Sequence, residues 1–83
     1  MVNDKTMSFK VERDGNAKAK EILKDVYQAL VEKGYNPINQ LAGYILNGDE
    51  SYITNHKNAR NLITKIDRNE LLNLMIRCYL SVD

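Results

Sequence analysis

The sequence predicts an all-α fold, a compact bundle of four to five short helices with a flexible N-terminal arm. Apolar residues recur at intervals of three and four in four separate stretches, which is the period of a helix with one buried face. Residues that end or begin helices, such as Gly34, Pro37, Gly48 and Asp67, stand between these stretches. The chain has 83 residues, enough for one domain at most.

The first fifteen residues differ from the rest. Residues 1–15 carry scattered charge, show no sustained helical period and end in Asp14-Gly15, a turn signal. We therefore expect a mobile arm at 1–15, with one short extended piece at 8–12, and a helical domain at 16–83.

The first helix is expected over residues 17–33. Its apolar residues follow the i, i+3, i+4, i+7 rule, and charged residues occupy most positions between them. The residues predicted to face the core are Ala19, Ile22, Leu23, Val26, Tyr27 and Leu30.

A tight corner should follow. Gly34 can take the left-handed conformation that closes a helix, Asn36 can cap the next helix, and Pro37 suits a first helical position. A short helix is then predicted over 37–46, ended by Asn47-Gly48. Its inward residues should be Ile38, Leu41, Ala42, Ile45 and Leu46.

Two further helices are predicted after a short turn at 51–53. The first covers 55–66, with Ala59, Leu62, Ile63 and Ile66 facing inward. The second covers 68–80, because Asp67 followed by Glu70 resembles a capping box.

The last predicted helix carries more apolar residues than one buried stripe needs. Its apolar residues are Leu71, Leu72, Leu74, Met75, Ile76, Cys78, Tyr79 and Leu80. A single cysteine excludes an internal disulfide, and a domain of this size needs support beyond its own core. We therefore expect a homodimer in which this helix packs on two surfaces.

Several functional classes are disfavoured. There is one histidine, no Gly-rich phosphate loop and no nucleophile elbow, so we expect neither an enzyme nor a bound cofactor. His56 and Cys78 belong to no metal-binding pair, and Cys78 is expected as a small buried apolar residue. No apolar run approaches about 18 residues, and the start lacks the apolar core of a signal peptide. We expect a cytoplasmic protein without membrane insertion.

A helix-turn-helix DNA-binding protein remains the alternative. The predicted helices 37–46 and 55–66 are joined by a turn, and the second carries Lys57, Arg60 and Lys65. The net charge of only +1 disfavours nucleic acid as a partner, because DNA readers usually carry a basic surface.

One position in the arm has a sharp functional interpretation. Thr6 is followed by Met7-Ser8-Phe9, in a segment expected to be accessible to a kinase. Most hydroxyls in such tails have no role, and Ser8 is a rival acceptor.

A known family shares the most distinctive stretches of this chain. These are Glu32-Lys33-Gly34-Tyr35-Asn36-Pro37-Ile38-Asn39-Gln40-Leu41, then Gly43-Tyr44-Ile45-Leu46-Asn47-Gly48-Asp49, Tyr52-Ile53 and Asn58-Ala59-Arg60. With them the chain resembles the IreB/ReoM family of small regulatory phosphoproteins from Gram-positive bacteria, over nearly its whole length.

The resemblance implies a function. It implies a non-enzymatic regulator that a Ser/Thr kinase with PASTA domains phosphorylates at Thr6. The cognate phosphatase is expected to remove this phosphate. It also implies control of peptidoglycan precursor synthesis, through proteolysis machinery or an adaptor acting on a precursor enzyme. Arg60 and Arg68 match arginines expected to bind the partner or the phosphorylated arm. The chain departs from the family pattern at Glu50, Thr54, Asn55 and Thr64.

Overall fold

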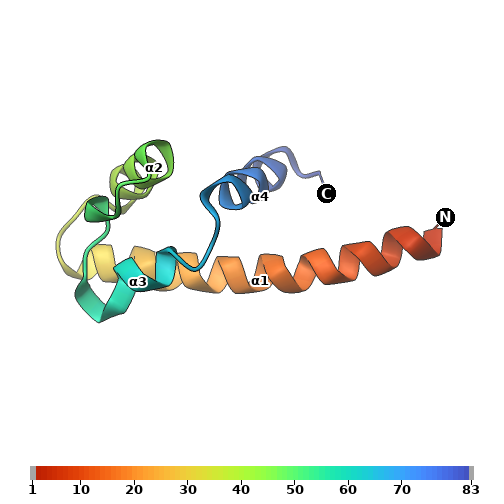
Figure 1. Cartoon of the computed structure of the whole chain (residues 1–83), viewed down its shortest axis with the longest axis horizontal. Coiled ribbons are helices and arrows are strands. Elements are labelled where there is room, and N and C mark those ends of the chain that lie inside the picture. Colours follow the sequence, from red (N-terminus) through yellow and green to blue (C-terminus); the bar gives the residue numbers. More distant parts are fainter. Residues whose placement is uncertain (1, 83) are drawn as a thin grey trace.

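The computed structural model describes the backbone of residues 2–82 and the side chains of residues 17–82. All regular structure in this part is helical. The α-helices are α1 (Val2–Glu32), α2 (Pro37–Asn47), α3 (Ala59–Ile63) and α4 (Arg68–Leu80), and the 3₁₀ turns are η1 (Glu50–Tyr52) and η2 (His56–Asn58). The long helix α1 runs the length of the molecule, with α2 and α4 on one side of it (Figure 1). The predicted all-α class is confirmed.

The start of α1 differs from the prediction. The helix begins at Val2 rather than at residue 17, so it includes residues 8–12, for which an extended piece was wrongly expected. The missing apolar period indicated the absence of a buried face, but a helix does not require one. This stretch has no proline to break a helix and includes the helix formers Lys5, Met7, Lys10, Glu12 and Arg13. Side chains before Ala17, including Thr6 and Ser8, lie outside the described part. The mobility of an arm at 1–15 therefore stays a prediction.

The core lies along one face of α1 and draws on every other helix. Val26, Ala29 and Leu30 of α1 have no solvent exposure. The other members of this buried cluster are Leu41 and Tyr44 of α2, Ile53 directly after η1, Ala59 and Ile63 of α3, and Leu71 of α4. Tyr27 was predicted to face this core but is 44% exposed, since Ala29 occupies the inward position instead.

The corner after α1 is confirmed in detail. Gly34 has φ +83°, and two backbone bonds close the helix, from Gly34 N to Val31 O and from Tyr35 N to Leu30 O, both 3.0 Å. This is the Schellman pattern, in which a left-handed residue satisfies the last carbonyls of a helix. Asn36 then accepts a hydrogen bond from Asn39 N at 3.1 Å, which caps α2.

Helix α2 has the predicted start but buries fewer residues than expected. Leu41 and Tyr44 are buried, whereas Ile38 and Leu46 are 65% and 81% exposed, and Ala42 is also exposed. The helix packs mainly on α1 and η1, and its exposed apolar residues lie away from these contacts.

The prediction of one continuous helix over 55–66 is wrong. A 3₁₀ turn occupies His56–Asn58, and Lys57 and Asn58 have φ of +53° and +63°. Only Ala59–Ile63 continues as α3. The turn predicted at 51–53 corresponds to η1.

Helix α4 has the predicted bounds, and Asp67 caps it by accepting a hydrogen bond from Glu70 N at 3.1 Å. Leu71 is its only buried residue. Its exposed apolar residues, with the tail, are Leu72, Ile76, Tyr79, Leu80 and Val82. The predicted apolar excess is therefore present, and the second subunit that would cover it stays a prediction. Across residues 2–82, no helix is both long enough and apolar enough to cross a bilayer.

Candidate interaction site around loop 48–53

The loop between α2 and α3 is held by its own polar side chains. Asp49 accepts hydrogen bonds from Ser51 N at 3.0 Å and from Ser51 Oγ at 2.8 Å, and so caps η1. These two bonds lower the pKa of Asp49, and the positive charge of Arg60 lowers it further to a smaller extent. Asp49 is thus a carboxylate at neutral pH and keeps the loop in one conformation.

Tyr52 fastens the same loop to α2. Gln40 Nε2 donates to the Tyr52 carbonyl at 2.8 Å, and Asn47 Nδ2 donates to the Tyr52 hydroxyl at 3.3 Å. The tyrosine ring lies so close to Gly43 that a Cβ atom there would overlap it. Glycine is needed at this position because the ring occupies the space of a side chain.

Arg68 lies at one end of the loop. Its Nη1 donates to the carbonyl of Ile45 at 2.8 Å, and its guanidinium lies over Gly48, the left-handed residue that ends α2. Ile45 O is among the last carbonyls of the helix, which lack intrahelical partners and attract positive charge. Arg68 therefore links the start of α4 to the end of α2.

Arg60 lies at the other end of the loop. Its Nε donates to the carbonyl of Ile53 at 2.9 Å, and the side chain is half-buried. The two predicted partner-binding arginines thus flank loop 48–53, each bound to a backbone carbonyl. Each of these arginines therefore makes a structural hydrogen bond and is not simply a solvated surface residue.

The charges around the loop are mixed. Burial raises the pKa of Tyr44, the negative charge of Glu50 raises it further, and the positive charge of Arg68 opposes this rise. The exposed residues of the loop itself include the acidic pair Asp49 and Glu50. The arginines are therefore accompanied by carboxylates, and any anion that binds there has to compete with them.

A second polar cluster joins α1 to η2. His56 Nε2 lies 2.7 Å from Glu32 Oε1, and Lys57 Nζ lies 3.2 Å from Oε1 and 3.3 Å from Oε2 of the same carboxylate. The hydrogen bond from His56 and then that from Lys57 lower the pKa of Glu32. Sequence reasoning missed this cluster, because nothing local connects Glu32 to residues so far along the chain.

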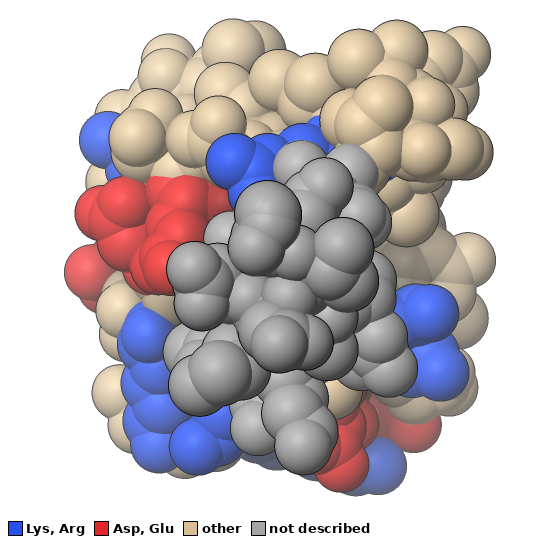
Figure 2. Space-filling view, turned by 90° about the vertical axis from the view of Figure 1, so that its right-hand side faces the viewer, with Lys and Arg blue, Asp and Glu red and all other residues tan. Residues whose placement is uncertain are grey.

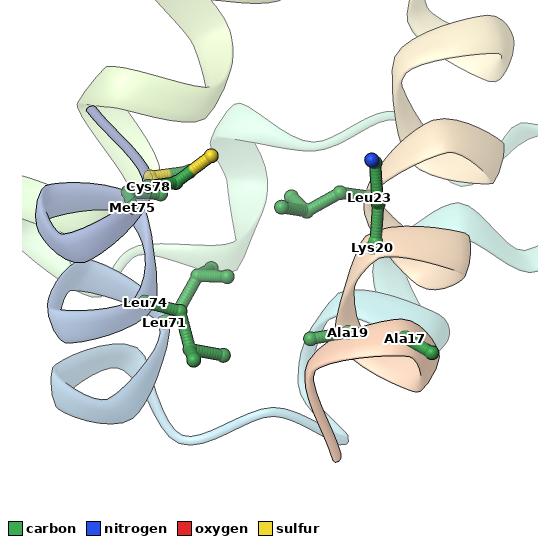
Figure 3. A pocket seen from close by; sticks show the side chains of 8 residues that line it. All are labelled: Ala17, Ala19, Lys20, Leu23, Leu71, Leu74, Met75 and Cys78. Atoms are coloured by element: carbon green, nitrogen blue, oxygen red, sulfur yellow. The ribbon is translucent and has the colours of Figure 1, made fainter. Parts of the chain in front are cut away.

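An apolar groove of about 290 Å³ lies between α1 and α4. Leu71, Leu74, Met75 and Cys78 of α4 face residues from Ala17 to Leu23 of α1 across it, and Lys20 lies at its edge (Figure 3). Cys78 was expected to be buried but is exposed. The reason is that α4 packs on the core through Leu71 and Met75 and leaves its C-terminal half at the surface.

Among the described residues visible along α1 from its N-terminal end, Lys and Arg do not gather into one basic region (Figure 2). Lys and Arg atoms lie on several sides of that face, with Asp and Glu atoms between them (Figure 2). Helix α3 is only Ala59–Ile63, and residues 48–58 separate it from α2. A helix-turn-helix needs a recognition helix after a short turn, so this geometry does not match the DNA-binding alternative.

Among the side chains of residues 17–82, no three His, Cys, Asp or Glu residues are grouped so that they could hold a metal ion. The polar side chains that join separate elements lie at the arginine-flanked loop and in the Glu32 cluster. The fold and site therefore define a small all-helical domain whose distinctive polar features are structural contacts and an exposed loop.

Comparison with known proteins gives the family. Residues 4–81 match the family described as IreB regulatory phosphoprotein, and the chain belongs to this family. It is 58% identical to a UPF0297 protein of Acetivibrio thermocellus over 80 residues, which are 96% of this chain and 89% of the relative. It is 56% identical to a UPF0297 protein of Ruminiclostridium cellulolyticum over 77 residues, 93% of this chain and 88% of the relative. The family description supports a regulatory role.

Proposed function

We propose that this protein is a non-enzymatic, cytoplasmic phosphoprotein that a PASTA-type Ser/Thr kinase modifies at Thr6. The observation that carries the proposal is the match to a family of regulatory phosphoproteins over residues 4–81, a range that includes Thr6. Its action is proposed to be on peptidoglycan precursor synthesis, through protein–protein contacts with proteolysis machinery or an adaptor. The cognate phosphatase would return it to the unmodified state.

The arrangement of Arg60 and Arg68 supports a role in recognition. A phosphorylated threonine adds about −1.5 to −2 charge and three acceptor oxygens. The bonds of these arginines to Ile53 and Ile45 orient the two guanidinium groups at opposite ends of loop 48–53. Each bond uses one nitrogen of its arginine, and a guanidinium has five N–H donors in total. Groups fixed in this way can give charge-assisted bonds to a phosphate with little loss of side-chain freedom.

The apolar surface of α4 supports a homodimer as the working form. Leu72, Ile76 and Leu80 are 43%, 49% and 61% exposed, although the helix is firmly capped. A second copy would remove such a surface from water. Light scattering should give the mass of two chains, and a well-folded monomer at high micromolar concentration would contradict this part of the proposal.

Phosphorylation of the purified protein tests the proposal as a whole. The cognate PASTA-type kinase should add one phosphate to the parent protein, as read by intact mass and peptide mapping. Thr6→Ala should abolish most of this incorporation, while Ser8→Ala, its matched control, should retain it. Parental labelling of Thr6→Ala, with the phosphate mapped to Ser8 or Thr54, would refute the site. No labelling of the parent protein would refute its role as a kinase substrate.

A further inference from the structure

The turn before α3 has a backbone conformation that its residues do not favour. Lys57 and Asn58 are consecutive and both have positive φ, at +53° and +63°. The left-handed region is disfavoured for residues with a Cβ atom, and asparagine tolerates it better than lysine. Two such residues in succession need a stabilising contact from elsewhere in the fold.

The local features around this turn favour a longer helix. The apolar spacing of 55–66 has the helical period. Asn55 already has right-handed helical angles, with φ −83° and ψ −5°. Thr54 Oγ1 accepts a hydrogen bond from His56 N at 3.2 Å, which is the bond that an N-cap threonine makes to the second residue of a helix. The cap for a helix starting at Asn55 is therefore in place, and the helix is interrupted at Lys57 and Asn58.

Glu32 supplies the contact that opposes this longer helix. Its carboxylate lies 2.7 Å from His56 Nε2 and within 3.3 Å of Lys57 Nζ through both oxygens. Glu32 is the last residue of α1 and directly precedes the Schellman corner, so its backbone position is well fixed. The carboxylate of Glu32 thus contacts both side chains that enter the left-handed turn.

We propose that Glu32 is a latch that holds turn 56–58 in its left-handed form, and that without the latch residues 55–63 join into one continuous helix. The element has two states, a broken and an unbroken helix, and the charge of Glu32 favours the broken one. Because Arg60 is the second residue after the turn, the change of state would turn its guanidinium away from the Ile53 carbonyl, to which its Nε now donates at 2.9 Å.

Nuclear magnetic resonance of the labelled full chain tests this proposal. Cα chemical shifts and cross-correlated relaxation report the sign of φ at residues 57 and 58. The parent should show positive φ at both. In Glu32→Ala the ratio of left-handed to helical turn should fall about three- to tenfold, because two solvent-exposed charge-assisted contacts are lost. Contacts between His56 and Arg60 across one helical turn should appear with it. Glu21→Ala, an exposed glutamate of the same helix, is the matched control and should behave as the parent.

A second pair of variants keeps the test decisive. Lys57→Met removes one of the two latch contacts without touching α1, and it should move the turn in the same direction if Glu32→Ala fails to fold. Adding Lys57→Gly to Glu32→Ala should restore positive φ at that position, because glycine accepts it freely. Positive φ at residues 57 and 58 in a folded latch variant, at the parental population, would overturn the proposal.

Discussion

Replacing Gly43 by alanine tests the packing that holds loop 48–53 on α2. In an exposed helix interior the change from glycine to alanine stabilises by about 1 kcal/mol. Here the new Cβ atom would overlap the ring of Tyr52. Overpacking costs about 1–3 kcal/mol, and displacing the ring also removes the bond from Asn47, with a net value of about 1 kcal/mol. We therefore expect Gly43→Ala to destabilise the protein by about 1–3 kcal/mol, or about 4–24 °C in melting temperature.

The control for this prediction is a background in which the effect of Gly43→Ala on stability should change sign. In a Tyr52→Ala background the obstructing ring is absent, so Gly43→Ala should stabilise by up to about 1 kcal/mol through helix propensity alone. Urea unfolding of the four proteins in this cycle gives both values and their coupling. A higher midpoint for Gly43→Ala in the parent background would show that the ring does not need this space.

Three further predictions concern the polar contacts and the corner. Arg68→Ala should lower the free energy of unfolding by about 0.3–1 kcal/mol in urea titrations, because the exposed Ile45 carbonyl exchanges a charged donor at a helix end for water; a midpoint equal to the parent's would contradict a stabilising role for that contact. Gly34→Val should lower the free energy of unfolding by about 1–2 kcal/mol in the same assay. The cause is backbone strain alone, since no atom lies within 4 Å of the added Cβ position. An unchanged free energy of unfolding would contradict the left-handed conformation at Gly34. The pKa values of Glu32 and Asp49 are lowered from 4.5 and 3.8, so their stabilising contributions are present above those values and lost as the pH falls through the folded-state pKa values. The melting temperature of Glu32→Gln should therefore depend less on pH than that of the parent below about pH 4.5, and parallel curves would refute the assignment.

Features determined by neighbouring residues could be predicted from the sequence. The Schellman corner at Gly34, the cap of α2 by Asn36 and the cap of α4 by Asp67 each depend on residues within a few positions of one another. These features can be predicted because each one depends on a single residue and the backbone groups next to it. The fold class followed from the helical period in the same way.

Features that depend on tertiary contacts could not be predicted. The break at Lys57 and Asn58 replaces a helix that the local pattern favours, and it is held by Glu32 from another helix. The apolar period predicted that Ile38 faces the core. In the structure Ile38 is exposed, because α1 and η1 pack against a different side of α2. The start of α1 was missed for the opposite reason, because residues without a buried face can still be helical.

The candidate site was predicted in part. Sequence similarity singled out Arg60 and Arg68, and the fold brings them to the two ends of one loop. Their bonds to backbone carbonyls were not foreseen, since a carbonyl acceptor leaves no signature in a sequence. Replacement of Arg60 is for this reason expected to affect the fold as well as recognition.

The central proposal is that phosphate on Thr6 is read by Arg60 and Arg68. It requires the predicted arm at 1–15 to leave α1, because in a continuous helix from Val2 to Glu32 Thr6 lies at the opposite end from loop 48–53. The guanidinium N–H resonances of Arg60 and Arg68 test it most directly. In protein phosphorylated at Thr6 we expect the Arg60 and Arg68 side-chain resonances to shift relative to the unmodified protein, while those of Arg77 stay in place. The shifts should disappear when the phosphatase removes the phosphate. Identical Arg60 and Arg68 resonances in the two forms, with Thr6 fully phosphorylated, would contradict the claim.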